Sequence, residues 1–357
     1  MKKVVLFFAL AVGLLASAAT VQAQIVNMSR YITLTVTDGA AIRLNFKAAA
    51  NGTPVRIVSG STTQNITVGP DWYDRNWPGT FTVTAGSTTM TIYGDLTDFS
   101  CSGNYANLTA IDLSHNTQLQ RLWCYSNQLT SLDVSKNTQL AYLSCSSNTL
   151  SSLDVSHNTQ LTTLDCKNNK LNSLNVSGCT QLEELRCYDN NLTSLNVSNT
   201  QLELLYCDDN NFSSQALDDI YCSLPDRTGK ENGVIRPVYN SSSSYNNTVL
   251  ATNAQNATAK NWKVQYVDNT DIPTTGKHKC SATDIAEAAA EPSLTLYPNP
   301  VADELYLSAT ARTIRIYNVY GVEVAHATDT DRVEVSHLPA GIYTVKADGT
   351  VAKMVKR

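Results

Sequence analysis

Residues 140–169, LAYLSCSSNTLSSLDVSHNTQLTTLDCKNN, contain one complete repeat unit and the beginning of the next. The first half of the unit reads Leu-x-x-Leu-x-Cys-x-x-Asn and is carried by Leu140, Leu143, Cys145 and Asn148. The second half reads Leu-x-x-Leu-Asp-Val-Ser-x-Asn-Thr-Gln, and the pattern restarts 21 residues after its first leucine. A short fixed period is typical of a solenoid, in which each unit buries its apolar edge on its neighbours.

The repeat extends well beyond this stretch. Cysteines recur at one position of the pattern, namely Cys101, Cys124, Cys145, Cys166, Cys187 and Cys207. The asparagine that follows each of them is Asn104, Asn127, Asn148, Asn168 or Asn169, Asn190 and Asn210. The last interval between cysteines is 20 residues, and we place the missing residue between Ser198 and Asn199. The first copy, from Leu96, is degenerate.

Strand alternation points the leucines and cysteines of each unit into a shared interior. Strands lie about 4.8 Å apart, so the cysteines are expected to form a ladder of buried thiols. A free cysteine behaves as a small hydrophobe, and a zinc site would need paired short spacings that are missing here. The recurring asparagines are expected to hydrogen-bond backbone groups where the chain leaves the strand. Cys179 occupies an asparagine position and is predicted to be structural, while Cys222 and Cys280 lie outside the ladder.

Residues 96–212 resemble the leucine-rich repeats of the internalins, in the 21-residue cysteine-bearing form found in internalin J and in internalin-like surface proteins of Bacteroidota. The resemblance implies a mostly β fold, a curved solenoid with a parallel sheet on its concave face. It also implies adhesion or host contact. The chain lacks the cell-wall sorting motif of the listerial proteins.

The outward positions of the predicted sheet carry the candidate ligand-binding residues. By alternation they are Arg121, Trp123, Tyr125, Tyr142, Asp165, Lys167, Glu184, Arg186, Tyr188, Tyr206 and Asp208. Exposed tryptophan, tyrosine and arginine are enriched at binding hot spots. The alternative is that these rings stack on neighbouring rungs as cross-strand pairs. We predict a binding face on the concave sheet.

The start of the chain has the form of a signal peptide. Lys2 and Lys3 precede an apolar run from Val4 to Leu15, and small residues lead to a cleavage point after Ala23. Residues 1–23 are therefore predicted to be removed on export.

The predicted repeats are flanked by caps, because the open ends of a solenoid expose its core. Residues 24–95 are predicted to be a β-rich N-terminal cap or a small separate domain, with strands at 31–36, 41–46, 55–58 and 80–84. Trp72, Tyr73 and Trp77 are expected to form a packed aromatic corner. Residues 213–270 are predicted to be the C-terminal cap, in which a short helix through Leu224, a strand at 234–239, a helix at 246–260 and a strand at 262–267 follow one another. Residues 271–292 are predicted to be a linker.

Residues 293–357 form a compact β pattern with seven predicted strands, which favours an Ig-like β-sandwich. The strands are expected at 294–297, 304–308, 313–318, 323–327, 332–336, 342–347 and 351–356. The motifs are Leu296-Tyr297-Pro298-Asn299-Pro300, Ile316-Tyr317-Asn318 with Gly321, Leu338-Pro339-Ala340-Gly341-Ile342-Tyr343, and the basic end at Lys353, Lys356 and Arg357.

This C-terminal stretch resembles the sorting domain of type IX secretion substrates. The resemblance implies passage across the outer membrane by that secretion machinery and display outside the cell. It further implies removal of the domain by a sortase-like protease, and linkage to surface lipopolysaccharide.

Charge and motifs exclude several other functions. The formal net charge is −5, and residues 96–212 carry five Lys and Arg against eleven Asp and Glu, which disfavours nucleic acid and heparin-like glycans. The histidines do not converge, and no hydrolase, P-loop or metal motif occurs, so we expect no catalytic site, metal or cofactor. Asp133 and Asp154 align with asparagines in later repeats, which favours a polar ladder. Asp189, Asp208 and Asp209 are read as a solvated rim rather than a calcium site.

Two binding functions remain, with a hydrolase as the weakest alternative. The first is adhesion to a protein or glycan ligand on a host or neighbouring cell, or in biofilm. The second is surface capture of a nutrient, such as a glycan, a peptide or haem, because aromatic rings stack on sugars and porphyrins. A hydrolase would have to use residues 24–95, which contain no histidine or cysteine.

Overall fold

The computed structural model describes residues 25–70, 81–280, 296–297, 301–317, 323–339, 341–348 and 350–357. The chain divides into two compact units, Met1–Asn137 and Thr138–Arg357, called here the first and second units. The predicted signal peptide and the aromatic corner of Trp72, Tyr73 and Trp77 lie outside the described residues. No helix in the described part of the chain is long and apolar enough to cross a membrane.

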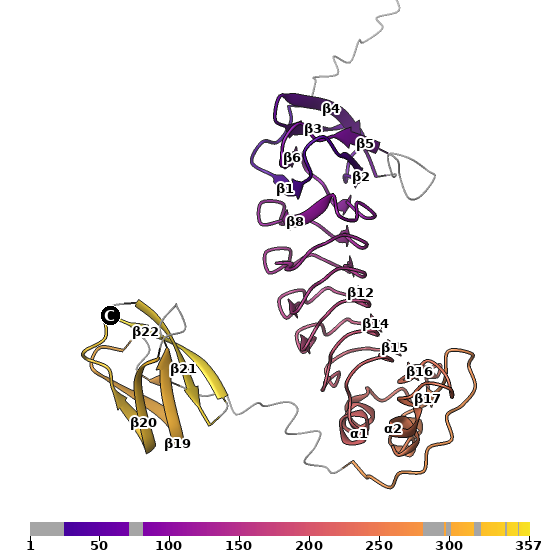
Figure 1. Ribbon diagram of the computed structural model, residues 1–357, viewed down its shortest axis with the longest axis vertical. Coiled ribbons are helices and arrows are strands. Elements are labelled where there is room, and N and C mark those ends of the chain that lie inside the picture. The colour runs from indigo at the N-terminus through magenta and orange to yellow at the C-terminus, as the bar shows by residue number, and fades with distance from the viewer. Residues whose placement is uncertain are drawn as a thin grey trace, which may run out of the picture. The chain divides into compact units, whose positions relative to one another are not determined.

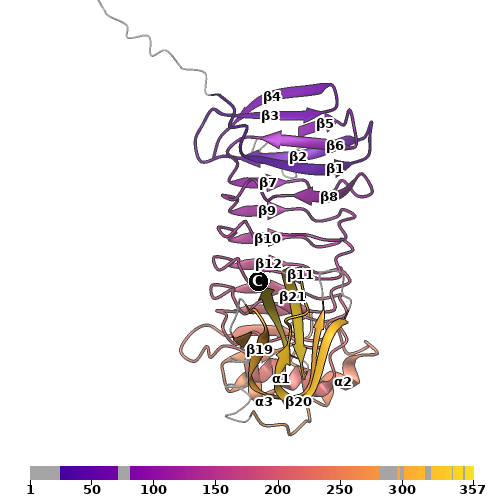
Figure 2. The same ribbon diagram turned by 90° about the vertical axis from the view of Figure 1, so that its left-hand side faces the viewer.

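The first unit consists of strands only, within its described residues. They are β1 (Tyr31–Val36), β2 (Ala41–Lys47), β3 (Thr53–Ser59), β4 (Thr62–Val68), β5 (Phe81–Thr84), β6 (Thr89–Tyr93), β7 (Asp98–Ser100), β8 (Leu108–Asp112) and β9 (Arg121–Trp123). One antiparallel sheet has the order β4-β3-β6-β1-β8, and a second part of the unit has the order β5-β2-β7-β9 (Figure 2). Strands β4 and β6 were not predicted, although both contain β-branched residues that favour strands.

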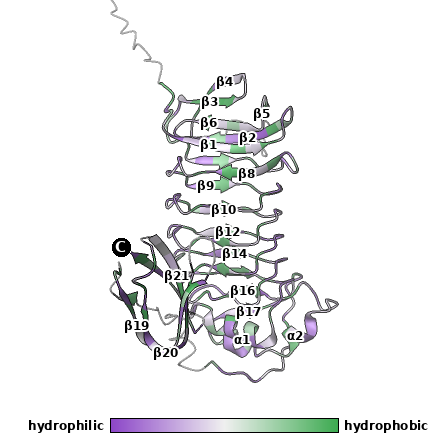
Figure 3. Ribbon diagram, turned by 60° about the vertical axis from the view of Figure 1, so that its left-hand side comes forward, coloured by the Kyte–Doolittle hydropathy of each residue, from purple (hydrophilic) through white to green (hydrophobic). Residues whose placement is uncertain are grey.

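The N-terminal strands close the edge of the repeat sheet. Antiparallel β2 pairs with β7, the first repeat strand, while β7 and β9 pair in parallel. Phe46 on β2 packs against Phe99 on β7, with ring centroids 5.8 Å apart. Hydrophobic stretches on β8 and β9 are visible in Figure 3. This pairing favours the cap over a separate domain for residues 24–95, since β2 hydrogen-bonds to an edge that would otherwise be open.

The second unit contains repeat coils with their own parallel sheet, followed by helices. Its elements up to residue 264 are β10 (Tyr142–Ser144), β11 (Leu153–Asp154), β12 (Thr163–Asp165), β13 (Leu174–Asn175), β14 (Glu184–Arg186), β15 (Leu204–Tyr206), α1 (Ser214–Ser223), β16 (Gly233–Arg236), α2 (Asn246–Leu250), α3 (Gln255–Thr258) and β17 (Trp262–Val264). The main sheet runs β10-β12-β14-β15-β16-β17, one strand for each successive coil (Figure 1). β11 and β13 form a separate two-stranded parallel sheet.

Each coil is filled by its leucines and cysteines. Leu164, Cys166, Leu185 and Cys187 have no exposed surface, and the remaining ladder cysteines are equally buried. Each fully buried leucine contributes roughly 1.5–3 kcal/mol. Burial raises the pKa of the Cys101 thiol to about 12 and keeps the pKa of the Cys207 thiol well above its ordinary value. The ladder thiols are therefore protonated, apolar and shielded.

A ladder of asparagine amides fastens neighbouring coils to one another. The Nδ2 of Asn169 donates to the backbone oxygens of Cys145 and Cys166, each at 3.1 Å. Its Oδ1 accepts from the backbone N–H of Leu150 at 3.0 Å. These bonds identify Asn169 as the ladder asparagine of its repeat. Asn168, the other candidate, adopts a left-handed backbone with φ of 54°. In the other coils of the second unit the left-handed position is held by Ser147, Asp189 and Asp209.

The second turn of each coil uses an Asp or Asn oxygen. The Oδ1 of Asp154 accepts from the backbone N–H of Ser156 at 2.9 Å, and that of Asn175 from Ser177 at 3.1 Å. Such Asx turns use only an acceptor oxygen, so Asp and Asn are interchangeable there. This explains why the turn position holds Asp in some repeats and Asn in others.

The position of the missing residue differs from our prediction. Thr200 is buried, its N–H donates to the oxygen of Val197, and it occupies the place that Cys179 holds in the preceding coil. The deletion therefore follows Thr200 rather than Ser198. Threonine is tolerated there because its hydroxyl donates to the same Val197 oxygen at 2.7 Å.

The cap after the last repeat is built around α1. The side chain of Ser213 accepts from the N–H of Ala216 and caps this helix, and a Cys222–Cys280 disulfide joins its last turn to a segment 58 residues further on. The single helix expected at 246–260 is two short helices, α2 and α3.

The predicted linker at 271–292 is wrong over its first ten residues. Ile272 is buried, and Thr275 and Gly276 donate to backbone oxygens at the end of α2. Residues 271–280 are therefore a strap held on the cap, and they will be called the strap below. The rest of the predicted linker lies outside the described residues.

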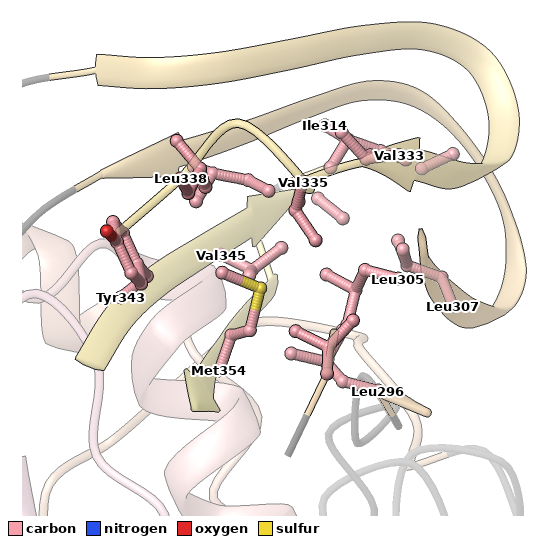
Figure 4. Close-up of a cluster of buried hydrophobic side chains, with 14 residues drawn as sticks. Leu296, Leu305, Leu307, Ile314, Val333, Val335, Leu338, Tyr343, Val345 and Met354 are labelled. Atoms are coloured by element: carbon pink, nitrogen blue, oxygen red, sulfur yellow. The ribbon is translucent and has the colours of Figure 1, made fainter. Parts of the chain in front are cut away.

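The C-terminal residues form β18 (Leu296–Tyr297), β19 (Glu304–Tyr317), β20 (Glu323–Glu334), β21 (Gly341–Ala347) and β22 (Thr350–Lys356). Four of the seven predicted strands merge into two long ones, because Ala311 and Thr313 of β19 stay paired with β20 across the expected breaks. A register shift between Tyr306 and Ala311 interrupts the β19–β20 pairing, and the hydrophobic residues collect in one core between the strands (Figure 4).

Candidate functional site: the exposed face of the parallel sheet

Three predicted face residues belong to the first unit. The guanidinium of Arg121 pairs with the buried carboxylate of Asp98, and Trp123 is half-buried. Tyr125 lines a hollow of about 130 Å³ together with Arg43. These three side chains therefore lie on a packed surface beside a shallow hollow.

In the second unit the strand register aligns the outward side chains in rows across the sheet. One row runs from Asp165 through Arg186 and Tyr206 to Arg236, because β12, β14, β15 and β16 pair in that register. A second row, one position beyond the cysteines, contains Lys167, Tyr188 and Asp208. The 21-residue period therefore brings together residues that are far apart in the sequence.

The tyrosine rings are covered by cations from neighbouring coils. The guanidinium carbon of Arg236 lies 4.4 Å from the ring centroid of Tyr206, and that of Arg186 lies 5.9 Å from the same centroid. The ammonium of Lys167 lies 5.4 Å from the centroid of Tyr188. Each such pair stabilises its geometry by about 0.5–1 kcal/mol at an exposed site. The cross-strand stacking that the sequence left open is therefore present here, between rings and cations.

Ion pairs hold two of the three cations. Lys167 lies 3.4 Å from Asp165, and Arg186 lies 2.5 Å from Glu184. Burial lowers the pKa of Lys167, but the Asp165 carboxylate and the Tyr188 hydroxyl raise it more, so it stays above its ordinary value. Arg236 donates instead to the neutral Oδ1 of Asn269 at 2.8 Å. Among the described residues, Arg236 makes no ion pair with a carboxylate.

These rows enclose a pocket of about 230 Å³, called here the sheet-face pocket. Its lining consists of Lys167, Arg186, Tyr188, Tyr206, Asp208, Arg236, Tyr239 and Val267. Five of these residues were predicted from alternation. Tyr142, Asp165 and Glu184 lie on the same sheet but outside the lining, and the last two anchor cations.

Arg236, Tyr239 and Val267 were missed, because the leucine pattern stops before them. Arg236 had a usable signal, since it occupies an outward position of a strand that was predicted from Val234 onward. Among the described residues, no three His, Cys, Asp or Glu side chains are grouped so that they could hold a metal ion.

Asp208 is the one carboxylate in the lining of the sheet-face pocket. Burial is the main cause that raises its pKa to about 6; Asp209 and Asp189 add to the rise, and a backbone hydrogen bond and Arg236 oppose it. Because the folded-state pKa exceeds the ordinary value of 3.8, the charged form destabilises the fold above about pH 6, and this penalty is relieved as the pH falls toward 4.

We therefore expect Asp208→Asn to be more stable than the parent at pH 8 and equally stable near pH 4. Urea unfolding at both values measures the difference. An advantage of the variant that grows toward low pH would contradict this assignment. Glu183→Gln, which removes an exposed carboxylate from the preceding coil, is the control for a general charge effect.

The C-terminal motif residues have a packing role. Leu296, Leu338 and Tyr343 belong to the C-terminal core and are almost fully buried (Figure 4). Ile316 is fully buried in the same core. The hydroxyl of Tyr343 donates to the backbone oxygen of Pro339 at 2.8 Å and closes the turn before β21. Residues 295–357 match the family described as the secretion system C-terminal sorting domain. The match confirms the resemblance seen in the sequence and covers this C-terminal segment of the chain.

Solved leucine-rich-repeat structures resemble other parts of the chain. An internalin (InlF) from Listeria monocytogenes is 22% identical with a TM-score of 0.30, over 36% of this chain and 36% of that one. A leucine-rich-repeat protein of Leptospira interrogans is 25% identical with a TM-score of 0.25, over 31% and 36%. The functional domain of InlJ from Listeria monocytogenes, described as including a cysteine ladder, is 17% identical with a TM-score of 0.21, over 73% and 86%. The chain thus spans only about a third of the first two structures. No curated protein matches the sequence.

Proposed function

We propose that this protein is a secreted or surface-displayed leucine-rich-repeat binding protein that adheres to a ligand on a host or neighbouring cell, or in biofilm. The observation that carries the proposal is the sheet-face pocket, where Arg186, Tyr206 and Arg236 form one stacked row. Cation–ring pairs fix these side chains before a ligand arrives, which reduces the entropy lost on binding. Tyrosine and arginine are also the residue types that dominate binding energy at interfaces.

The sorting domain supports the cellular side of the proposal. A chain that carries it is a substrate of type IX secretion machinery, which places the repeats outside the cell. Removal of the domain by a sortase-like protease and linkage to lipopolysaccharide are part of the same proposal. An exported repeat protein with a preformed pocket is suited to contact with other cells.

The proposal predicts that Arg186→Gln combined with Arg236→Gln lowers adhesion at least tenfold. Beads coated with the purified protein and counted on cell monolayers give the measurement. The control is Lys136→Gln combined with Lys170→Gln, which removes the same charge from exposed side chains outside the pocket. Circular dichroism establishes that both variants are folded. Adhesion of the pocket variant at the parental level would show that the sheet face is not the binding surface.

Nutrient capture is a second candidate, favoured by the size of the sheet-face pocket. A volume of about 230 Å³ suits a small ligand better than a protein surface. Such a function predicts saturable binding of free glycan, peptide or haem in the absence of cells. Binding only to intact cells would favour adhesion.

A further inference from the structure

Cationic side chains outnumber carboxylates in the lining of the sheet-face pocket, although the whole protein is acidic. The lining contains three cationic side chains and one carboxylate, an excess of two positive charges, whereas the chain carries a formal charge of −5. Asp165 and Glu184 neutralise Lys167 and Arg186 from outside the lining. Arg236 makes no ion pair with a carboxylate among the described residues: its guanidinium donates to the neutral amide of Asn269 and lies over the ring of Tyr206, although its charge also lowers the pKa of Asp208. A negative group on a ligand can therefore form an ion pair with Arg236 without displacing a carboxylate from it.

Part of the pocket lining is an exposed apolar surface. Tyr239 is 54% exposed and Val267 is 36% exposed, which makes them two of the five large hydrophobic residues exposed in the described chain. A hydrogen bond of 3.1 Å from the backbone N–H of Val267 to the oxygen of Tyr239 keeps them side by side. The ring of Tyr206 already has guanidinium groups against it, so Tyr239 is the ring with exposed surface to offer. Aromatic faces of this kind pack on flat apolar groups, including the C–H faces of sugars.

Asp208 decides which anion fits. Its carboxylate repels a sulfate or a benzoate, because at neutral pH these groups have no hydrogen to donate to it. A hydroxyl-bearing anion donates to Asp208 while its own charge faces Arg236. Ligand pockets for drug-sized molecules measure about 300–1,000 Å³, so 230 Å³ suits a single ring rather than a longer chain.

We propose that the sheet-face pocket binds one carboxylate-bearing sugar ring, with the carboxylate at Arg236, a ring face on Tyr239 and a hydroxyl donating to Asp208. This inference rests on the proposed function in that it assigns a ligand class to the same pocket. It identifies an acidic terminal sugar of a surface glycan as the group recognised.

Calorimetric titration of the purified full-length protein tests the proposal with four probes. They are N-acetylneuraminic acid, methyl glucuronide, the neutral methyl glucoside, and benzoate, which has a carboxylate and a ring but no hydroxyl. We expect at least one of the two acidic sugars to bind at least tenfold more tightly than methyl glucoside and benzoate. Arg236→Gln and Tyr239→Ala should each weaken that sugar at least tenfold, and Lys170→Gln should leave its affinity unchanged.

The outcomes separate this inference from the proposed function. Equal binding of benzoate and the acidic sugars would overturn the role of Asp208 and with it the sugar class. If neither acidic sugar binds while the double arginine variant still loses cell adhesion, the ligand class is wrong and the adhesion site stands. If an acidic sugar binds at Arg236 but adhesion does not depend on the pocket, the ligand class is right and the adhesive function is wrong.

Discussion

Replacing Asn190 with alanine is expected to lower the free energy of unfolding by roughly 3 kcal/mol, because one buried side chain serves several backbone groups. Its Nδ2 donates to the oxygens of Cys166 and Cys187, both at 3.1 Å. Its Oδ1 accepts from the buried N–H of Leu171 at 3.0 Å. Alanine leaves that N–H without an acceptor inside the coil, where water cannot replace it.

The loss is limited because neighbouring ladder residues share the same carbonyls. The oxygen of Cys166 also accepts from Asn169, and that of Cys187 also accepts from Asn210, each at 3.1 Å or less. Each carbonyl therefore keeps one donor. The stability of a repeat protein depends on interfaces between neighbours, so a weakened rung reduces the coupling of the coils on both sides of it.

Asn191→Ala is the matched control for this prediction. The side chain of Asn191 is exposed, and its backbone N–H donates to the oxygen of Leu171 at 2.9 Å, a bond that alanine retains. Urea unfolding followed by circular dichroism compares the two variants with the parent. Equal unfolding midpoints for Asn190→Ala and Asn191→Ala would rule out the ladder as a major source of stability.

The repeat made the solenoid predictable from sequence, because each periodic residue has one local role. The inward leucines and cysteines follow from alternation, and the Asp and Asn at the second turn are interchangeable because only an acceptor oxygen is needed. The deletion was misplaced because Asn199 and Thr200 match the Asn-Thr pair of the earlier repeats. Packing instead places Thr200 at the position that asparagine holds in those repeats. A buried threonine whose hydroxyl satisfies a turn carbonyl replaces asparagine without changing the coil.

The pocket was predictable only in part, since some of its residues belong to the leucine repeats and the others follow the last repeat. Alternation gave Arg186, Tyr188 and Tyr206 their outward positions. Tyr239 and Val267 follow the last leucine repeat, and a backbone hydrogen bond between them brings them together. No periodic pattern marks such a contact. The strap was missed for a similar reason, because its polar composition resembles a linker while its backbone hydrogen bonds hold it on the cap.

The Cys222–Cys280 disulfide is expected to contribute about 4 kcal/mol to the stability of the cap, the largest effect of any single bond predicted for this protein. It closes a loop of 58 residues between the end of α1 and the end of the strap. A crosslink of that span restricts the unfolded chain strongly, since the entropy of loop closure grows with loop length. Sequence alone could not pair these cysteines, because their proximity depends on how the strap folds back onto the helices.

Cys222→Ser combined with Cys280→Ser should therefore unfold at a much lower urea concentration than the parent. Reduction of the parent with dithiothreitol should reproduce the same shift, and the double variant should not respond to the reductant. The other seven cysteines are buried and form no disulfide, so they supply no second disulfide whose reduction could mimic the effect. The strap also makes backbone hydrogen bonds to the end of α2, so loss of the disulfide should loosen the cap without detaching the strap. The repeats should then keep their secondary structure. A parent protein whose unfolding midpoint is unchanged by dithiothreitol would show that those hydrogen bonds alone hold the strap.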